Sequence, residues 1–385
     1  MASIRLTIEK LVEKGDGLAR YGGKVVFVPQ ALPGEVVMAS IVEQKGDYAR
    51  ARLDDIVEKS ESRVISACPY YDQCGGCDLQ HLAYESQVKE KESLLFENLR
   101  RIGKIERPQT YLDPVKSVPF AYRSRLRFHV DLERGTAGFL SRYSNSLVDI
   151  EHCMIASERL NRLLGEKRPL LLKAAKMRQA ESKNKRLSSL IEVPAFEGDS
   201  AISLSSHDVQ THVSGHRFYV DSSVFFQANR FVLPEMVDFV TTHVTGDRVM
   251  DLYSGVGLFA AFLESRCTSV IAVEQDKRCL ELARKHLGEK TEFFSEPVEQ
   301  WSRSYKKNID SVVVDPPRGG LDVQVVKAIV SWSPETIVYV SCNSVTLARD
   351  LKRFEQLGYK PQVMQMFDLY PQTSHVETIV ILSRE

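Results

Sequence analysis

The sequence has no apolar run that approaches the roughly 18 residues a helix needs to cross a bilayer, so we expect no membrane partner. The N-terminal residues become charged at Glu9 and Lys10 and lack the apolar stretch of a secretory signal, which favours a cytoplasmic protein. Charge of either sign is not in excess, because 51 Lys and Arg stand against 51 Asp and Glu. This balance excludes a uniformly basic, nucleic-acid-coating surface but leaves room for a local basic face.

Internal repeats and low-complexity segments are also lacking, and cysteine is scarce. Seven unevenly spaced cysteines in 385 residues do not suggest a disulfide framework. Apolar residues make up 43% of the chain and charged residues 26%, which excludes wholesale disorder and collagen-like structure. The length predicts two or three domains.

Residues 1–60 are predicted to form a small β-barrel. Short strand patterns at 4–11, 24–28, 35–42 and 49–57 alternate with Gly- and Pro-rich turns. So many short strands in so few residues are typical of a small closed barrel.

Residues 61–222 are predicted to form a central α+β domain. A cysteine-rich loop at 66–80 precedes a predicted helix at 83–103, which we expect to dock on the C-terminal domain. The strand pattern at 122–130 places Arg123, Arg125 and Arg127 on one face. A helix is predicted at 157–186, and residues 188–222 are β-rich.

The predicted helix at 157–186 has a basic end. Its basic side chains are Lys167, Arg168, Lys173, Lys176, Arg178, Lys183, Lys185 and Arg186. Together with the arginine row at 122–130, they are candidates for contacts with RNA phosphates. A solvated charged face remains the alternative for both.

Residues 223–385 are predicted to form an α/β domain. Apolar, β-branched runs at 249–252, 269–274, 311–315 and 337–341 alternate with helical stretches, and a last apolar strand lies at 378–382. This pattern predicts a Rossmann-like parallel sheet that is covered by helices on both faces.

A glycine-rich turn closes the first of these strands. Residues 251–260 read DLYSGVGLFA, which also fits a dinucleotide-binding turn. Asp251 lies ahead of the glycines, where it would repel a pyrophosphate but suit the amine-bearing part of S-adenosylmethionine. Glu274 ends the next strand and can accept both ribose hydroxyls. We therefore favour S-adenosylmethionine over NAD; a tight turn without a ligand remains the alternative.

A proline motif follows the strand at 311–315. Pro316 and Pro317 fix a rigid, extended exit from the sheet and place Asp315 at the same edge as Asp251. Enzymes of this fold that methylate exocyclic amines carry an aromatic residue after two such prolines. Arg318 stands there, so amine methylation is disfavoured.

Cys342 ends the next strand at the predicted crevice and is a candidate nucleophile. A thiolate that adds to carbon 6 of a pyrimidine makes carbon 5 nucleophilic enough to accept a methyl group. A base must then remove the carbon 5 proton, and Glu377 is the stronger candidate beside His375. An inert buried cysteine and a surface carboxylate are the alternatives.

With these residues in place, the chain resembles the bacterial RNA (uracil-5-)-methyltransferases, in particular the branch that acts on 23S rRNA. The resemblance implies that residues 1–60 form an OB-like, RNA-binding TRAM domain. It implies a 4Fe–4S cluster in the central domain and class I methyltransferase chemistry in residues 223–385. It also implies an S-adenosylmethionine-dependent enzyme, which we expect to be a monomer that binds RNA and neither DNA nor a membrane.

The resemblance also assigns individual residues. The cluster ligands would be Cys68, Cys74, Cys77 and Cys153, with a structural role for the cluster. The cofactor residues would be Gln227, Tyr253, Glu274 and Asp315. Cys342 would be the nucleophile and Glu377 the proton acceptor. The chain departs from some members at Leu258 and Pro297, where they carry polar residues, and neither position is counted in the site.

Several alternatives stay open. Cysteine spacing alone suits structural zinc as well as an iron–sulfur cluster. A tRNA substrate is possible, as is a non-catalytic iron–sulfur RNA-binding protein or an NAD-dependent oxidoreductase. Cytosine methylation is a near variant, but RNA enzymes of that kind usually use two cysteines, and only Cys342 lies at this edge.

Overall fold

The computed structural model describes residues 3–106, 108–181 and 190–384. The chain divides into two compact units, each interrupted in sequence. Unit 1 comprises Met1–Leu94, Leu140–Val148 and Tyr370–His375; unit 2 comprises Leu95–Phe139, Asp149–Leu369 and Val376–Glu385. The predicted division at residues 60 and 222 remains a prediction. Within the described ranges, no helix is long and apolar enough to cross a membrane.

A six-stranded sheet with the order β1-β5-β6-β4-β3-β2 opens unit 1. Its strands are β1 (Ser3–Thr7), β2 (Lys10–Leu11), β3 (Gly17–Tyr21), β4 (Lys24–Val28), β5 (Val36–Gln44) and β6 (Tyr48–Glu58), with a 3-10 turn at Glu13–Gly15. Strands β1 and β2 occupy opposite edges of the sheet, yet only Ile8 and Glu9 separate them in the chain. The three residue steps from Thr7 to Lys10 span at most about 11 Å, so the two edges must approach each other and the sheet must curl into a barrel.

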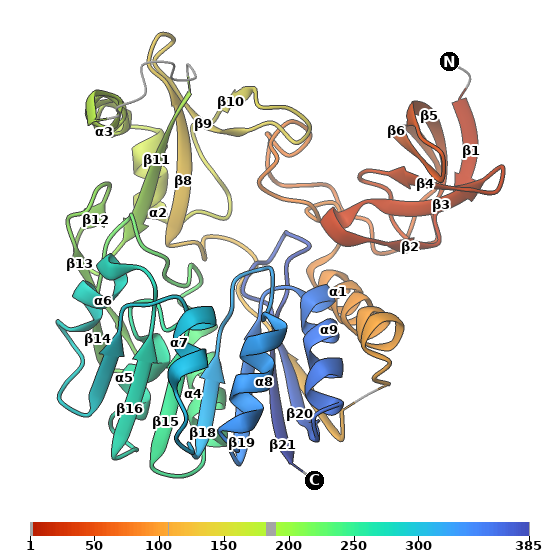
Figure 1. Ribbon diagram of the computed structural model, residues 1–385. Coiled ribbons are helices and arrows are strands. Elements are labelled where there is room, and N and C mark those ends of the chain that lie inside the picture. Colours follow the sequence, from red (N-terminus) through yellow and green to blue (C-terminus); the bar gives the residue numbers. More distant parts are fainter. Residues whose placement is uncertain (1–2, 107, 182–189, 385) are drawn as a thin grey trace. The chain divides into compact units, whose positions relative to one another are not determined.

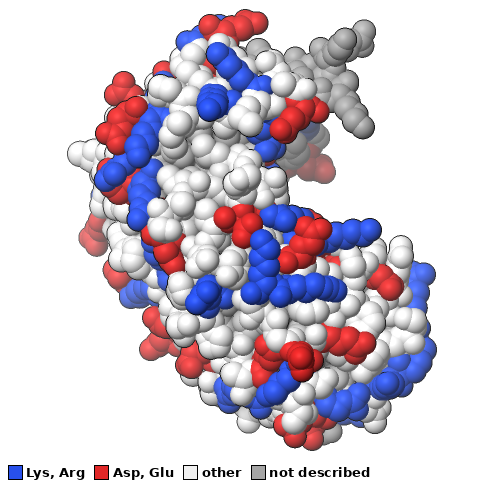
Figure 2. Space-filling view, turned by 90° about the vertical axis from the view of Figure 1, so that its left-hand side faces the viewer, with Lys and Arg blue, Asp and Glu red and all other residues white. Residues whose placement is uncertain are grey.

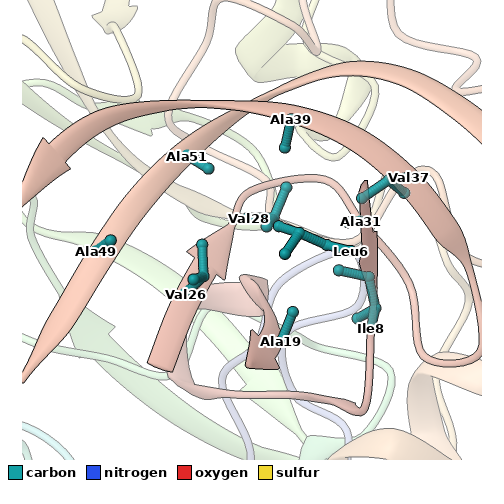
Figure 3. Close-up of a cluster of buried hydrophobic side chains, with 10 residues drawn as sticks. All are labelled: Leu6, Ile8, Ala19, Val26, Val28, Ala31, Val37, Ala39, Ala49 and Ala51. Carbon is teal, nitrogen blue, oxygen red and sulfur yellow. The ribbon is translucent and has the colours of Figure 1, made fainter. Parts of the chain in front are cut away.

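Small apolar side chains fill the barrel. Figure 3 shows them pointing toward one another from the surrounding strands and the loop that follows β4. The cluster consists of Leu6, Ile8, Ala19, Val26, Val28, Ala31, Val37, Ala39, Ala49 and Ala51. Five of these ten residues are alanines, which fit the narrow interior of a small barrel. The predicted N-terminal barrel is therefore confirmed as an architecture.

The rest of unit 1 joins three distant segments. Helix α1 (Tyr84–Asn98) follows the cysteine-rich loop and lies in this unit as far as Leu94. The segment 140–148 pairs with the cysteine-rich loop, since the Gly75 amide donates to the Leu140 carbonyl at 2.9 Å and the Arg142 amide to the Gln73 carbonyl at 3.0 Å. The third segment, Tyr370–His375, is held by the same loop and by α1.

Antiparallel strands dominate the first half of unit 2. A five-stranded sheet has the order β10-β9-β8-β11-β12, and β13 pairs with β14 in a hairpin. These strands are β8 (Arg125–Asp131), β9 (Thr136–Leu140), β10 (Leu147–Asp149), β11 (Leu190–Glu197), β12 (Ile202–Ser203), β13 (Val209–Val213) and β14 (His216–Val220). Burial alternates along residues 122–130 as predicted, with Tyr122, Leu126 and Phe128 inside and Arg127 exposed.

The single helix predicted at 157–186 is wrong. The structure has two helices, α2 (Glu158–Leu164) and α3 (Arg168–Glu181). Gly165 ends α2 with non-helical backbone angles, and glycine is a common helix terminator. Lys183, Lys185 and Arg186 of the predicted basic end lie outside the described residues.

An eight-stranded sheet with the order β17-β16-β15-β18-β19-β21-β20-β7 forms the second half of unit 2. Its strands are β7 (Thr110–Val115), β15 (Arg248–Leu252), β16 (Ser269–Val273), β17 (Thr291–Phe294), β18 (Ser311–Val314), β19 (Thr336–Ser341), β20 (Tyr359–Phe367) and β21 (Glu377–Arg384). The helices are α4 (Leu233–His243), α5 (Leu258–Leu263), α6 (Lys277–Ala283), α7 (Val298–Ser304), α8 (Val323–Ser331) and α9 (Ser344–Glu355). Figure 1 shows α7, α8 and α9 together on one face of this sheet.

The sheet is mixed rather than fully parallel. Strands β15 to β19 pair in parallel as predicted, but β21 runs antiparallel to both β19 and β20. Strand β20 was missed because Pro361 and several polar residues interrupt its apolar pattern, and the pairing shifts register there. Strand β7, from the predicted central domain, adds to the far edge of the sheet.

The predicted helix at 83–103 becomes α1 followed by one π-helical turn, Leu99–Gly103. In unit 2, the Asn98 side-chain nitrogen Nδ2 donates to the Ser344 hydroxyl at 2.9 Å. A β-carbon on Gly103 would lie 2.9 Å from the Ala348 carbonyl oxygen. The end of this segment therefore packs closely on α9.

A buried ion pair closes the barrel and yields a stability prediction. The Glu35 carboxylate has no exposed surface and accepts hydrogen bonds from Arg63 and from the Leu32 and Ser60 amides. Since a buried charge without its partner is strongly destabilising, we expect Arg63→Ala to lower the free energy of unfolding by about 3–5 kcal/mol. The exposed pair of Arg5 and Glu58 supplies the control, and Arg5→Ala should cost less than about 1 kcal/mol.

The pair also sets a pH dependence. Burial alone would raise the pKa of Glu35, but Arg63 and the backbone amides outweigh it and hold the pKa below its ordinary value. The stabilisation is therefore present at neutral pH and is lost as pH falls through the folded-state pKa. Urea unfolding and hydrogen exchange of the β4 and β6 amides measure both effects. Equal losses in the two variants would contradict the ion-pair assignment.

Candidate functional site

The glycine turn at 251–260 joins β15 to α5 through left-handed backbone. Tyr253, Gly255 and Gly257 all have positive φ, at 60°, 56° and 78°. At Gly257 a β-carbon would lie 2.6 Å from the end of the Leu287 side chain, so a larger residue would have to displace Leu287 as well as adopt a strained φ. Asp251 fixes the turn, because its Oδ2 accepts a hydrogen bond from the Ala260 amide at 2.9 Å.

Three carboxyl groups gather at the carboxyl ends of the parallel strands. Asp251 is fully buried; burial raises its pKa to about 8, and Asp315 and Glu274 add to the rise while the Ala260 amide opposes it. Burial raises the pKa of Asp315 to about 7. Glu274 accepts hydrogen bonds from the Gly255 amide at 3.0 Å and the Asp276 amide at 2.8 Å. Two of the three groups, Asp251 and Asp315, thus have raised pKa values, which is typical of functional sites.

Tyr253 and Glu299 form a pair that the sequence did not suggest. The Tyr253 hydroxyl donates to the Glu299 carboxylate at 2.7 Å. Burial raises the pKa of Tyr253, and Glu299 raises it further. The tyrosine is therefore a neutral donor with a fixed ring. No periodicity marks Glu299, a half-buried carboxylate in the first turn of the short helix α7.

The proline-motif loop is held by α9. The Asn343 side chain caps this helix through its bond to the Val345 amide and also donates to the Arg318 carbonyl at 3.3 Å. Arg349 donates to the Gly319 carbonyl at 2.8 Å, and the buried Asp350 accepts from the Leu321 amide at 2.7 Å. The loop that carries Arg318 is thus tied to the helix that begins just after Cys342.

Cys342 and Glu377 lie at adjacent strand ends. Cys342 follows β19, and Glu377 is the first residue of β21, which pairs antiparallel with β19 so that Ser341 faces Thr378. The amino end of an antiparallel strand lies beside the carboxyl end of its neighbour. The antiparallel direction of β21, which the sequence did not predict, is what brings Glu377 to the edge that carries Cys342 and Asp315.

Burial and charge couple these side chains. Burial raises the pKa of the Cys342 thiol to about 12, with Glu377 and Asp315 adding to the rise and Arg318 opposing it. Burial also raises the pKa of Glu377 well above its ordinary value; Asp315 adds to this, and Arg318 again opposes it. Without a ligand, the Cys342 thiol is therefore protonated at neutral pH, and the Glu377 carboxyl group holds its proton more tightly than an ordinary glutamate.

Several buried polar atoms of this unit have no hydrogen-bond partner among the residues that the structure describes. They are Gln227 Oε1, Asp251 Oδ1, Ser254 Oγ and Glu377 Oε1. Buried polar atoms are normally paired, so each such atom needs an explanation. A polar ligand at the sheet edge would supply partners. Ser254 was not a predicted site residue, and only its place beside the glycines could have marked it.

Gln227 belongs to the same unit but comes from a different segment, the connection between β14 and α4. Its neighbour Asn229 anchors that segment by donating to the Ser117 hydroxyl at 2.9 Å and the Leu369 carbonyl at 3.0 Å. Arg278 holds the start of the segment through Asp221 at 2.8 Å. Gln227 is buried on a fixed segment rather than on a mobile loop.

The four predicted cluster cysteines are divided between the two units. Cys68, Cys74 and Cys77 lie in unit 1, whereas Cys153 lies in unit 2. Within the ranges the structure covers, no group of three or more His, Cys, Asp or Glu side chains could hold a metal ion. The cysteine-rich loop is nevertheless ordered, since Arg142 donates to the Cys77 carbonyl at 2.6 Å.

The candidate RNA-contacting arginines have mixed surroundings. Arg125 donates to the Val224 carbonyl at 3.0 Å and lies 5.7 Å from the Phe225 ring, while Arg127 pairs with Glu192 at 3.6 Å. Figure 2 shows Lys and Arg side chains interspersed with Asp and Glu on the face it presents. That face carries no uniformly basic coat, as the zero net charge predicts.

The chain is similar to known RNA methyltransferases over nearly its whole length. The family model described as tRNA (Uracil-5-)-methyltransferase matches residues 302–385, and the TRAM domain model matches residues 2–53. An uncharacterized RNA methyltransferase of Aquifex aeolicus is 31% identical over 98% of each chain. Another, from Bdellovibrio bacteriovorus, is 34% identical over 99% of this chain and 95% of that protein.

A solved structure shares the fold. The crystal structure of Pyrococcus abyssi tRNA (uracil-54, C5)-methyltransferase with S-adenosyl-L-homocysteine has a TM-score of 0.74 and 24% identity, covering 98% of this chain and 100% of that one. The likeness in fold and the match to the TRAM domain model confirm the predicted combination of an N-terminal TRAM domain and a C-terminal methyltransferase fold. The two full-length relatives lead to one conclusion: the chain belongs to a family of RNA methyltransferases, and its residues 302–385 match the uracil-5 family model.

Proposed function

We propose that this enzyme methylates carbon 5 of a uridine in 23S rRNA, with S-adenosylmethionine as methyl donor, Cys342 as nucleophile and Glu377 as proton acceptor. The observation that carries the proposal is the pairing of β19 with β21, which sets a thiol and a buried carboxyl group at adjacent strand ends. These are the two groups that the reaction requires.

The chemistry follows from the uracil ring. The Cys342 thiolate adds to carbon 6, and the electron pair moves to the ring as an enolate. Carbon 5 then attacks the sulfonium methyl group, and the thioether leaves. Glu377 removes the proton from carbon 5, the ring re-forms its double bond, and the bond between sulfur and carbon 6 breaks. Carbon 6 is inaccessible in a stacked helix, so the base must be unpaired or flipped.

The residues proposed to hold the methyl donor fit its polar groups. Glu274, already a hydrogen-bond acceptor for the glycine turn, would accept the ribose hydroxyls. Gln227 has a buried carbonyl oxygen without a partner among the described residues, which an amine of the ligand would satisfy. Tyr253 presents a fixed ring, and Asp315 a carboxyl group at the same edge. The donor supplies a methyl group on positively charged sulfur.

Substitution of the two proposed catalytic residues separates the steps. Cys342→Ala removes the nucleophile and should abolish transfer, a loss of at least about 10³-fold. Glu377→Gln leaves addition and transfer possible but removes the base, so a covalent RNA–protein adduct should accumulate. Transfer of labelled methyl groups to RNA and denaturing gels measure both outcomes. Cys267→Ala, a buried cysteine away from the sheet edge, is the matched control. Full activity of Cys342→Ala would refute the mechanism.

The substrate is the next part of the proposal. The resemblance to the 23S rRNA branch supports rRNA, whereas the likeness to a structure of a tRNA (uracil-54, C5)-methyltransferase favours tRNA as a second candidate. We expect 5-methyluridine to disappear from 23S rRNA, and not from tRNA, in a deletion strain. Mass spectrometry of nucleosides from the two purified RNA fractions measures this. Loss from the tRNA fraction alone would overturn the rRNA assignment.

We also propose a 4Fe–4S cluster with Cys68, Cys74, Cys77 and Cys153 as ligands. Thiolates are the donors that such clusters use. The segment 140–148 pairs with the cysteine-rich loop, and Cys153 follows that segment by five residues. A side chain on Gly75 would come within 3.1 Å of the backbone of Leu140 and Arg142, so the two segments are in close contact. The Cys74 sulfur accepts a hydrogen bond from the Gly76 amide at 3.4 Å.

The cluster proposal has a direct chemical test. Protein purified without oxygen should contain about four iron and four sulfide per chain. Cys77→Ser should lose iron and the visible absorption, whereas Cys279→Ser, a buried cysteine of unit 2, should retain both. One zinc per chain without sulfide would overturn the cluster in favour of structural zinc.

A further inference from the structure

The segment Tyr370–His375 lies just before Glu377 in the chain and is bound by the cysteine-rich loop in unit 1. The Asp78 and Leu79 amides both donate to the Gln372 carbonyl at 2.9 Å. In return, the Ser374 amide and hydroxyl donate to the Asp78 carboxylate at 2.9 and 3.0 Å. Four hydrogen bonds thus tie two segments that are almost 300 residues apart in sequence.

Helix α1 binds the same segment from a second direction. The Gln87 side-chain nitrogen Nε2 donates to the Gln372 side-chain oxygen at 2.9 Å. The Gln372 backbone amide donates to the Gln87 side-chain oxygen at 3.0 Å. Lys91 donates to the Tyr370 carbonyl at 3.0 Å. Gln87, Lys91 and Gln372 are all buried, so these bonds are shielded from competing water. We call the contacts of Asp78, Leu79, Gln87 and Lys91 with residues 370–375 the clamp.

The clamped backbone is strained. Gln372 has φ of 68°, in the left-handed region that a non-glycine residue rarely adopts. Such a conformation is unfavourable and persists only where the surroundings over-determine it, most often at functional sites. Here the backbone carbonyl, the backbone amide and the side chain of Gln372 are all held at once.

We infer that Asp78 and Gln87 are positioning residues for Glu377: they hold residues 370–375 in the conformation from which the chain enters β21 with Glu377 as its first residue. Ser374, the last residue in the clamp, precedes Glu377 by three residues. The inference rests on the proposed role of Glu377. Because Asp78 directly follows Cys77, the cysteine-rich loop then acts on one chemical step although it contributes no reacting atom.

The affected step is specific. A base must lie within hydrogen-bond reach of the proton it removes. Loss of the clamp would not move Cys342, which lies between β19 and α9. It would release residues 370–375, which lead to Glu377. Addition and methyl transfer should therefore continue, while proton removal slows. The adduct that Glu377→Gln traps should also appear when the clamp is weakened.

The experiment compares Asp78→Ala with Asp78→Asn in full-length protein as isolated. Alanine removes the acceptor for Ser374, whereas the asparagine oxygen can still accept from it. We expect Asp78→Ala to lower turnover about tenfold, the effect of losing a hydrogen bond to a charged group. The RNA adduct should accumulate during turnover, and kcat/KM for S-adenosylmethionine should stay within about twofold, since the step affected follows methyl transfer. Asp78→Asn should remain close to the parent enzyme.

A second readout does not depend on activity. Hydrogen exchange of the amides at Gln372, Ser374 and Glu377 should quicken in Asp78→Ala and stay slow in Asp78→Asn. Ser374→Ala removes only the hydroxyl bond of a half-buried residue and should give a smaller rise in adduct. This milder variant carries the test if Asp78→Ala fails to fold.

The outcomes separate the inference from the function on which it rests. If Glu377→Gln traps the adduct but Asp78→Ala and Ser374→Ala do not, the clamp does not position Glu377. If Asp78→Ala lowers turnover without accumulation of the adduct, or raises KM strongly, the clamp stabilises the fold only and does not position Glu377. If Glu377→Gln traps no adduct, it is the proposed mechanism that fails.

Discussion

The site depends on one strand direction. Strand β21 runs against β19, so a residue that opens one strand lies beside a residue that follows the other. Had β21 been parallel, its first residue would lie at the opposite edge of the sheet, far from Cys342. The reversal needs a connection that returns to the same edge, and β20 with residues 370–375 provides it. The geometry of the thiol and the carboxyl group is thus a property of sheet topology before it is a property of side chains.

The strands determine which edge of the sheet carries the site, but hydrogen-bonded loops position the side chains at that edge. Asn343, Arg349 and Asp350 hold the loop of Arg318 to α9, and the clamp holds the chain before Glu377. Two non-glycine residues with positive φ, Tyr253 and Gln372, lie in such loops. Strain of this kind is stored where the surrounding bonds are dense enough to maintain it. The site is therefore stiff, which suits a reaction with several consecutive steps on one ring.

Sequence patterns predicted much of this fold for a physical reason. Strands β15, β16, β18 and β19 are buried on both faces, so each is a continuous apolar run that stands out from its neighbours. Alternation in β8 was equally legible, because one face is buried and the other is not. Strand β20 could not be predicted, since Pro361 and polar residues interrupt its apolar pattern. The helix predicted at 157–186 also missed the end of α2 at Gly165.

The candidate site residues divide in the same way. The place of Asp251, Glu274, Asp315 and Cys342 at one edge could be predicted, because each lies near the end of a clearly apolar strand and parallel strands bring those ends together. The raised pKa values of Asp251, Asp315 and Cys342 could not be predicted, since they arise from burial that only packing decides. The bond from Ser374 to Asp78 spans 296 residues, and no local pattern encodes such a contact. Tyr253 was assigned by resemblance to a family, but no sequence pattern indicated its hydrogen-bond partner Glu299.

The protonation of the resting site poses a constraint that the reaction must satisfy. Burial raises the pKa of both the Cys342 thiol and the Glu377 carboxyl group, yet in the proposed reaction the thiol must lose its proton to attack and the carboxylate must be free to receive one. Negative neighbours oppose both losses, so positive charge must favour them. Arg318 lowers the pKa of both groups, and it lies on the loop that α9 holds in place. A methyl donor with a cationic sulfur would act in the same direction. We therefore expect binding of the donor to favour the thiolate form of the proposed nucleophile.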